Sequence, residues 1–142
     1  MRSRPELDLW RLWKLATETV RARIIEEVNA SSGLSDADLA VLFRVADGPG
    51  GEVRQHDLSV SLRWHRSRLS HQLTRMEKRQ LLGRKYSSGG VTVALTALGK
   101  QVLETAQPIF VAAIRKHFID LIPREQEKDF RAALERLVEG KP

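Results

Sequence analysis

Residues 64–79, WHRSRLSHQLTRMEKR, combine basic side chains with an apolar stripe. Arg, Lys and His residues stand there against a single acid, Glu77. Leu69, Leu73 and Met76 recur at helical spacing, so we predict a helix that buries these side chains. The opposite side of the helix would carry Arg, His, Ser and Thr side chains, which can hydrogen-bond to base edges or phosphates. The chemistry that this stretch indicates is therefore recognition of a nucleic acid.

The positive charge of the chain is concentrated around this helix. The whole sequence carries 24 Lys and Arg against 18 Asp and Glu, a net charge of +6. Residues 63–85 alone carry eight Lys or Arg against one acid, which leaves 16 bases and 17 acids elsewhere. Such a local excess suits a surface that binds a polyanion, because counterion release dominates affinity for nucleic acids. A basic face that is only solvated is the alternative on composition alone.

The sequence gives little support to enzyme or metal chemistry. The chain has no Cys, which excludes disulfides, thiolate zinc sites and thiol-based redox sensors. It holds no phosphate-binding loop, no nucleophile elbow and no His-Glu-x-x-His zinc motif. His56 and His65 could approach each other, but surface histidines are much commoner than metal sites. We expect no catalytic residue, no metal and no cofactor, and a small-molecule enzyme is the most remote of the alternatives.

The hydrophobic pattern predicts a mainly α protein with one small β-hairpin. Helices are expected over about 7–29, 35–46, 55–62, 66–80, 97–118 and 124–138. Val53 fits a very short strand, and LLGRKY and VTVALT fit two strands joined by SSGG. Ser35 and Thr96 are expected to cap the helices that follow them. Pro108 should kink its helix or split it near residues 105–107.

The order of helix, helix, basic helix and hairpin is that of a helix-turn-helix with a wing. The run LSDADLAVLFRVADGPGGEVRQHDLSVSLRWHRSRLSHQLTRMEKRQLLGRK, followed by VALTALGKQVL, resembles the MarR family of winged helix-turn-helix transcriptional regulators. The resemblance covers residues 34–103. Its most specific parts are the Ser-Arg-Leu-Ser-His-x-Leu-x-Arg-Met-Glu string, Leu81 and Leu82 with Arg84, and Leu95-Thr96-x-x-Gly99.

The resemblance implies a homodimer that binds double-stranded DNA. In a single domain over residues 1–142, residues 34–96 would form the winged helix-turn-helix part. Residues 5–30 and 97–140 would form the flanking dimerisation helices. Carried over position by position, the residues that face the major groove are Arg66, Ser67, Arg68, Ser70, His71 and Arg75. Phosphate or wing contacts are expected from Arg63, Lys78, Arg84, Lys85, Ser87 and Ser88.

The resemblance also implies a repressor that a small molecule could release from DNA. Members of the family often respond to small aromatic or phenolic ligands, so a small aromatic effector is the expected partner besides DNA. Trp10 and Trp13 would contribute to such a ligand pocket or to the dimer contact. The terminal helices carry more apolar surface than one small domain needs, although a core within one chain is the alternative.

Two positions depart from the family pattern. The family wing usually carries an Asp and an Arg before its second strand, whereas RKYSSGGVTV has neither an acid nor an Arg at its tip. The arginine that enters the minor groove in the family therefore has no counterpart at the tip of this wing. Gln80 stands where the family mostly has a Gly that ends the basic helix, so we expect this junction to end differently.

A competing hypothesis is a winged-helix module that binds proteins and has lost DNA binding. The short wing favours this hypothesis, whereas the nearly acid-free basic helix argues against it. No apolar run approaches the roughly 20 residues of a membrane span. The N-terminal MRSRPELDLW does not have the pattern of a signal peptide. We therefore expect a cytoplasmic protein without a membrane partner.

Overall fold

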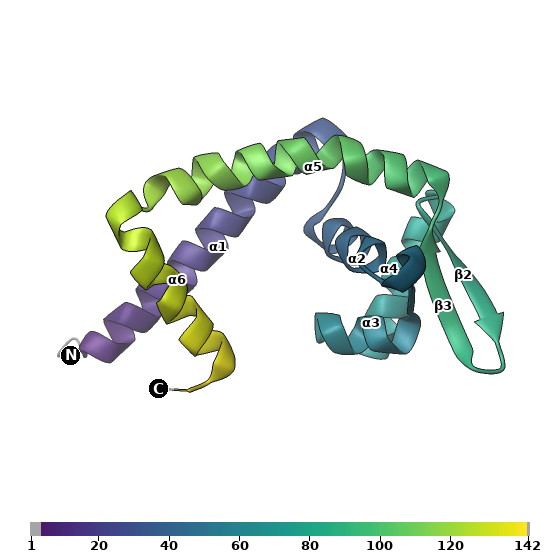
Figure 1. Ribbon diagram of the computed structural model, residues 1–142, viewed down its shortest axis with the longest axis horizontal. Coiled ribbons are helices and arrows are strands. Elements are labelled where there is room, and N and C mark those ends of the chain that lie inside the picture. The colour runs from purple at the N-terminus through teal and green to yellow at the C-terminus, as the bar shows by residue number, and fades with distance from the viewer. Residues whose placement is uncertain (1–3, 142) are drawn as a thin grey trace. The chain divides into compact units, whose positions relative to one another are not determined.

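The computed structural model describes residues 4–141, which form a mainly helical chain with a small antiparallel sheet (Figure 1). The helices are α1 (Pro5–Ser32), α2 (Asp36–Ala46), α3 (Gln55–Leu62), α4 (Arg66–Lys78), α5 (Ala97–His117) and α6 (Arg124–Glu139). The strands are β1 (Glu52–Arg54), β2 (Leu82–Ser87) and β3 (Gly90–Leu95), and the short 3-10 turns are η1 (Pro49–Gly51) and η2 (Ile119–Leu121). The expected mainly α winged-helix fold is confirmed, while the outermost ends of the expected 1–142 domain lie outside the described residues.

The chain divides into two compact units. One unit comprises residues 25–110, and the other comprises the chain up to residue 24 and from residue 111 onward. We call the first the winged-helix unit and the second the terminal unit. Helices α1 and α5 contribute residues to both units.

The winged-helix unit has a continuous apolar core. Fully buried Leu and Val side chains from α2, α3, α4 and β3 meet there, including Leu42, Leu58 and Val93. Leu69, Leu73 and Met76 of α4 are all 0% exposed, as their helical spacing predicts. Burial of each such side chain contributes about 1.5–3 kcal/mol of transfer free energy, so this stripe firmly attaches α4 to the unit.

The sheet positions the wing beside the basic helix. Its strand order is β1-β3-β2 and both pairings are antiparallel, so the central strand is β3. The predicted strand at Val53 is confirmed as β1, and Arg54 in it pairs with Thr92. Strands β2 and β3 form the predicted hairpin, with Ser87 opposite Gly90, and project beside α3 and α4 (Figure 1).

The helix boundaries follow from identifiable caps. Ser35 and Asp38 form a reciprocal capping box at the start of α2. Thr96 Oγ1 accepts a hydrogen bond from Gly99 N at 3.0 Å at the start of α5. A Cβ on Gly99 would clash with the carbonyl oxygen of Leu81, so this glycine allows α5 to start against the end of the basic helix. The predicted caps at Ser35 and Thr96 are both confirmed.

Two local expectations are wrong, one of them only in part. Of the kink or split expected at Pro108, the split does not occur, because α5 continues through this residue as one helix. Pro108 and Glu104 are both exposed, and water can therefore reach the carbonyl group that the proline leaves without an N–H donor. The second error concerns Gln80, which adopts the left-handed conformation with φ 61° that the family's glycine would be expected to adopt. Two contacts stabilise this junction: Gln80 N donates to Glu77 O at 2.9 Å, and Thr96 Oγ1 donates to Gln80 O at 2.6 Å.

The terminal unit buries few side chains. Among its described residues only Ile24 and Ala113 are buried, and α6 has no buried residue. Phe118 and Phe130 make an edge-to-face ring contact with centroids 6.1 Å apart, which connects the end of α5 to α6. Trp10 and Trp13, the predicted ligand-pocket or dimer residues, are 58% and 40% exposed on α1. This unit therefore leaves most of its apolar surface open to solvent.

Candidate nucleic-acid interface

Helix α4 separates an apolar side from a basic side. Ser67, Arg68, His71, Arg75 and Lys78 are exposed, opposite the buried stripe. Arg66 is also exposed at the first turn, whereas Ser70 is half-buried. The structure therefore brings the predicted groove-facing residues together on one helix face, with Ser70 at its margin. Such a face of hydrogen-bond donors is what readout of base edges requires.

The start of α4 is held by two residues to which the sequence assigned no role. His65 is the N-cap, and its Nδ1 accepts a hydrogen bond from Ser67 N at 3.2 Å and lies 2.8 Å from Ser67 Oγ. The guanidinium of Arg68 lies 4.1 Å from the ring centroid of Trp64, within the range of a cation–π contact. A His at the cap is hard to predict, because the usual capping residues are Ser, Thr, Asp and Asn.

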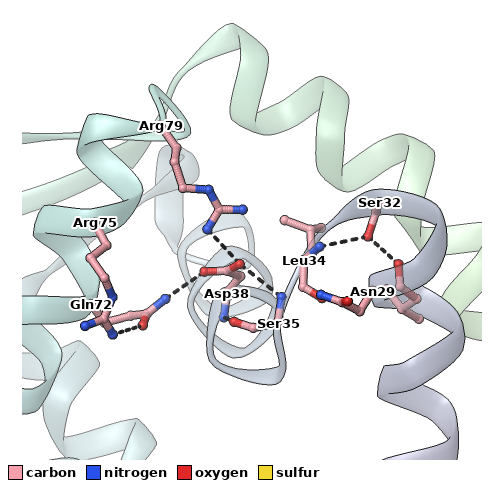
Figure 2. A network of polar contacts seen from close by, with 9 residues as sticks. Asn29, Ser32, Leu34, Ser35, Asp38, Gln72, Arg75 and Arg79 are labelled. Atoms are coloured by element: carbon pink, nitrogen blue, oxygen red, sulfur yellow. Dashed lines mark hydrogen bonds and ion pairs between the residues drawn. The ribbon is translucent and has the colours of Figure 1, made fainter.

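A buried carboxylate connects α2 to α4, as Figure 2 shows. Asp38 is 3% exposed, its Oδ1 accepts from Gln72 Nε2 at 2.7 Å, and its Oδ2 accepts from Arg79 Nη1 at 2.8 Å. Its Oδ2 also accepts from Ser35 N at 3.0 Å. Burial raises the pKa of Asp38, but the hydrogen bonds from Ser35, Arg79 and Gln72 and the positive charge of Arg79 outweigh burial and hold this pKa below its usual value. The carboxylate is therefore ionised and fully engaged.

The side chain of Arg84, a predicted phosphate contact, is turned toward α4 instead of toward solvent. Its side chain is 9% exposed, and its Nη2 donates to Glu77 Oε1 and to Thr74 Oγ1, both at 2.9 Å. Its Nη1 lies 3.5 Å from Ser70 Oγ. Arg84 thus attaches β2 to α4 and neutralises Glu77, the one acid of residues 63–85, so its guanidinium is engaged within the protein instead of facing a phosphate.

The wing tip has an arginine nearby that comes from another strand. Lys85, Ser87 and Ser88 are exposed, and Ser87 Oγ donates to Gly90 O at 3.3 Å. Arg54 of β1 is also exposed, and its Nη2 lies 4.0 Å from the position that a Cβ on Gly89 would occupy. The hairpin itself has no Arg at its tip, but the sheet brings one to it. Only the pairing of β1 with β3 reveals this arginine, and no local sequence signal predicts that pairing.

The remaining predicted cations differ in their surroundings. Arg63 is exposed and left-handed, with φ 55°, where it ends α3. Lys78 is exposed in the last turn of α4. Within residues 4–141 no group of His, Asp and Glu could hold a metal ion, and no helix is long and apolar enough to cross a membrane.

The sequence matches no protein-family model and no curated protein. Solved structures do match it. AbsC, a MarR family transcriptional regulator from Streptomyces coelicolor, is 28% identical over 99% of this chain and 96% of its own, with a TM-score of 0.88. Sco3205, a MarR family regulator from the same organism in complex with DNA, is 25% identical over 99% of this chain and 89% of its own, also with a TM-score of 0.88.

A third neighbour was solved with a ligand. The organohalide-sensing transcriptional regulator RdhR-CbdbA1625 in its 2,4-dichlorophenol-bound form covers 97% of this chain and 82% of its own, with 20% identity and a TM-score of 0.83. At this identity the match establishes only the fold.

The fold, the basic helix and these matches identify the chain as a DNA-binding transcriptional regulator with a winged helix-turn-helix. Within that class the chain fits a MarR-type regulator, which confirms the resemblance in its sequence. AbsC, Sco3205 and RdhR-CbdbA1625 are all described as transcriptional regulators.

Proposed function

We propose that the chain represses transcription as a homodimer bound to a pseudo-palindromic operator. The main support for this proposal is the exposed face of α4, on which basic and short polar hydrogen-bond donors lie together. Glu77, the acid on this helix, is neutralised by Arg84. In this proposal Arg66, Arg68, His71 and Arg75 contact base edges or phosphates in the major groove. Two such helices would occupy grooves about 10 base pairs apart and exclude RNA polymerase sterically.

The terminal unit supports the homodimer. Leu9, Leu12 and Leu15 of α1 are each more than 60% exposed, and so are Leu121 and Leu137 at the other end of the chain. Exposed apolar surface of this extent usually marks an interface between proteins. A second copy is the partner that a pseudo-palindromic site requires, because the two-fold symmetry of the protein would match that of the DNA.

Sequence-specific binding to an operator is tested by selecting, from random double-stranded DNA, the fragments that the protein binds. Arg68→Ala and Arg75→Ala should each weaken binding to the selected fragment by about 1–3 kcal/mol if each arginine forks onto a guanine. Arg23→Ala, an exposed arginine on α1, is the matched control and should leave affinity unchanged. Affinity should also fall steeply between low and moderate salt. A protein that enriches no sequence would instead favour the protein-interaction module.

A small aromatic effector is the second part of the proposal. Its support is the exposure of Trp10 and Trp13 and the 2,4-dichlorophenol found in one structural neighbour. A ligand that prefers a form unable to bind DNA would release the operator by population shift. Chlorophenols and aromatic acids should raise the melting temperature and weaken operator binding in the wild type, and both effects should diminish in Trp13→Ala. A screen in which no compound changes either property would remove the effector from the proposal.

A further inference from the structure

A buried amide lies beneath the exposed face of α4. Gln72 is 4% exposed, and its two amide atoms have different partners. Its Nε2 donates to Asp38 Oδ1 at 2.7 Å, and its Oε1 accepts from Arg75 Nη2, also at 2.7 Å. Figure 2 shows the side chain of Gln72 placed between those of Asp38 and Arg75. A buried side chain therefore joins a carboxylate on α2 to an exposed arginine on α4.

The chemistry of the two partners fixes the orientation of this amide. An ionised carboxylate offers only acceptors, so it can hold only the NH2 end of Gln72. A guanidinium offers only donors, so Arg75 needs the oxygen end. Rotating the amide by half a turn would place two donors together on one side and two acceptors together on the other. Asp38 thus determines that Gln72 presents an oxygen to Arg75.

Asp38 in turn has little freedom to move. Its Oδ2 accepts from Ser35 N at 3.0 Å and from Arg79 Nη1 at 2.8 Å, while its Oδ1 faces Gln72. Ser35 belongs to the capping box of α2, so the carboxylate is attached to the backbone at a helix start. The series of contacts from Ser35 to Arg75 consists of short, charge-assisted or buried hydrogen bonds, which restrict each side chain to one rotamer.

We infer that Gln72 is a specificity-determining positioning residue, which holds the guanidinium of Arg75 ready to read a base. This inference rests on the proposed function. An arginine carries five donors, and the bond to Gln72 occupies one, so the others stay available to a base. Holding a long side chain in place before binding lowers the entropy lost on binding, and it also favours one contact geometry over others.

A double-mutant cycle tests this role. The probe is the DNA sequence that the wild type enriches from a random double-stranded library, together with all its single base-pair variants. Arg75→Ala should lower discrimination at one base-pair position by between about fivefold and about 100-fold. Gln72→Met keeps the volume of the side chain and should lower discrimination at that same position, with non-specific affinity and salt dependence unchanged. In the Arg75→Ala background, Gln72→Met should have no further effect on discrimination.

Asp38→Asn gives a second, independent variant. Two donors face Oδ2, so the asparagine keeps its oxygen there and turns its NH2 toward Gln72. Gln72 must then rotate and present its own NH2 to Arg75, which breaks the bond that holds Arg75. Discrimination at the Arg75 position should fall although Gln72 is intact. Ser35→Ala is the matched control, because it removes the hydrogen bond that Asp38 N donates to Ser35 Oγ at 3.0 Å and should lower stability without changing discrimination.

Arg75 can also be observed without DNA. In ¹⁵N NMR of the free protein, the Nε–Hε signal that disappears in Arg75→Ala should report a rigid side chain in the wild type and a mobile one in Gln72→Met. Equal mobility in both proteins would overturn the inference, whatever the DNA data show. So would a uniform loss of affinity for all sequences, or losses that add in the double variant. A wild type that enriches no sequence would instead overturn the proposed function, while the NMR result still decides the Gln72–Arg75 contact.

Discussion

Two exposed arginines of α4 are each held by a supporting side chain. Arg68 lies against Trp64, and Arg75 is bonded to Gln72. The exposed members could be predicted from the sequence, since the apolar stripe fixes which side of the helix faces outward. The supporting members could not, because Gln72 resembles any polar residue of a basic helix until Asp38 is found beside it. That contact joins residues 34 positions apart in the chain.

Because Asp38 is ionised in the folded protein, we expect the stability of the protein to fall at low pH. The pKa of Asp38 is lower in the folded protein than in the unfolded chain, so folding favours the ionised form. Its contribution to stability is therefore complete above the ordinary aspartate pKa of about 3.9 and is lost as the pH falls through the lower folded value. The unfolding free energy of Asp38→Asn, measured by urea titration, should lie about 1–3 kcal/mol below that of the wild type at pH 7.

The difference between the two proteins should shrink as the pH falls from about 5 to about 2. Ser35→Ala provides the comparison, because it weakens the same helix start while leaving the carboxyl group in place. A gap between wild type and Asp38→Asn that stays constant over this pH range would contradict the assignment.

At the scale of elements, the junction after α4 differs from what its sequence indicates. Gln80 adopts a left-handed conformation although a side chain disfavours it, with a typical cost of about 1–2 kcal/mol. Gln80→Gly should therefore raise the unfolding free energy by roughly 1 kcal/mol in thermal or urea unfolding. Gln101→Gly on the exposed surface of α5 is the control, and it should lower stability by about 1 kcal/mol. Destabilisation by both changes would mean that Gln80 is not strained in solution.

The wing and the basic helix are joined by Arg84, which predicts different effects for two neighbouring cations. Arg84→Met should lower the unfolding free energy by about 1–3 kcal/mol, because it removes the hydrogen bonds that the guanidinium donates to Glu77 Oε1 and Thr74 Oγ1. Lys85→Met changes an exposed side chain and should alter stability by less than about 0.5 kcal/mol. Only Lys85→Met should lower the salt dependence of DNA binding, and equal effects on both properties would contradict the two roles.

The elements themselves were largely predictable. Apolar periodicity and turn residues predicted the helices and hairpin, and the basic helix was placed to within two residues. Position in space was harder to predict than secondary structure. Arg84 was expected to contact DNA and instead faces Glu77, because the register of β2 against α4 is a tertiary property. The same holds for Arg54, which the β1–β3 pairing brings close to the wing tip.

The molecule as a whole is predicted to be a dimer whose interface lies in the terminal unit. Light scattering should give twice the chain mass of 16.1 kDa for the wild type. Leu12→Glu places a charge on a leucine that is 62% exposed in one chain and should shift the mass toward that of a single chain. Val60→Glu is the matched control, since Val60 is 64% exposed but lies on α3 in the winged-helix unit. A Leu12→Glu protein that remains dimeric would place the interface elsewhere.

The buried Gln72 has a consequence for how DNA specificity could evolve or be engineered. Its oxygen is complementary only to a donor at position 75, so an acceptor such as glutamate there would meet another acceptor. A library that varies only the exposed positions of α4 should therefore rarely return an acceptor at position 75, whichever DNA is offered. If Gln72 positions Arg75 as we propose, positions 72 and 75 should covary among related proteins, and retargeting this helix should require a change at the buried position 72.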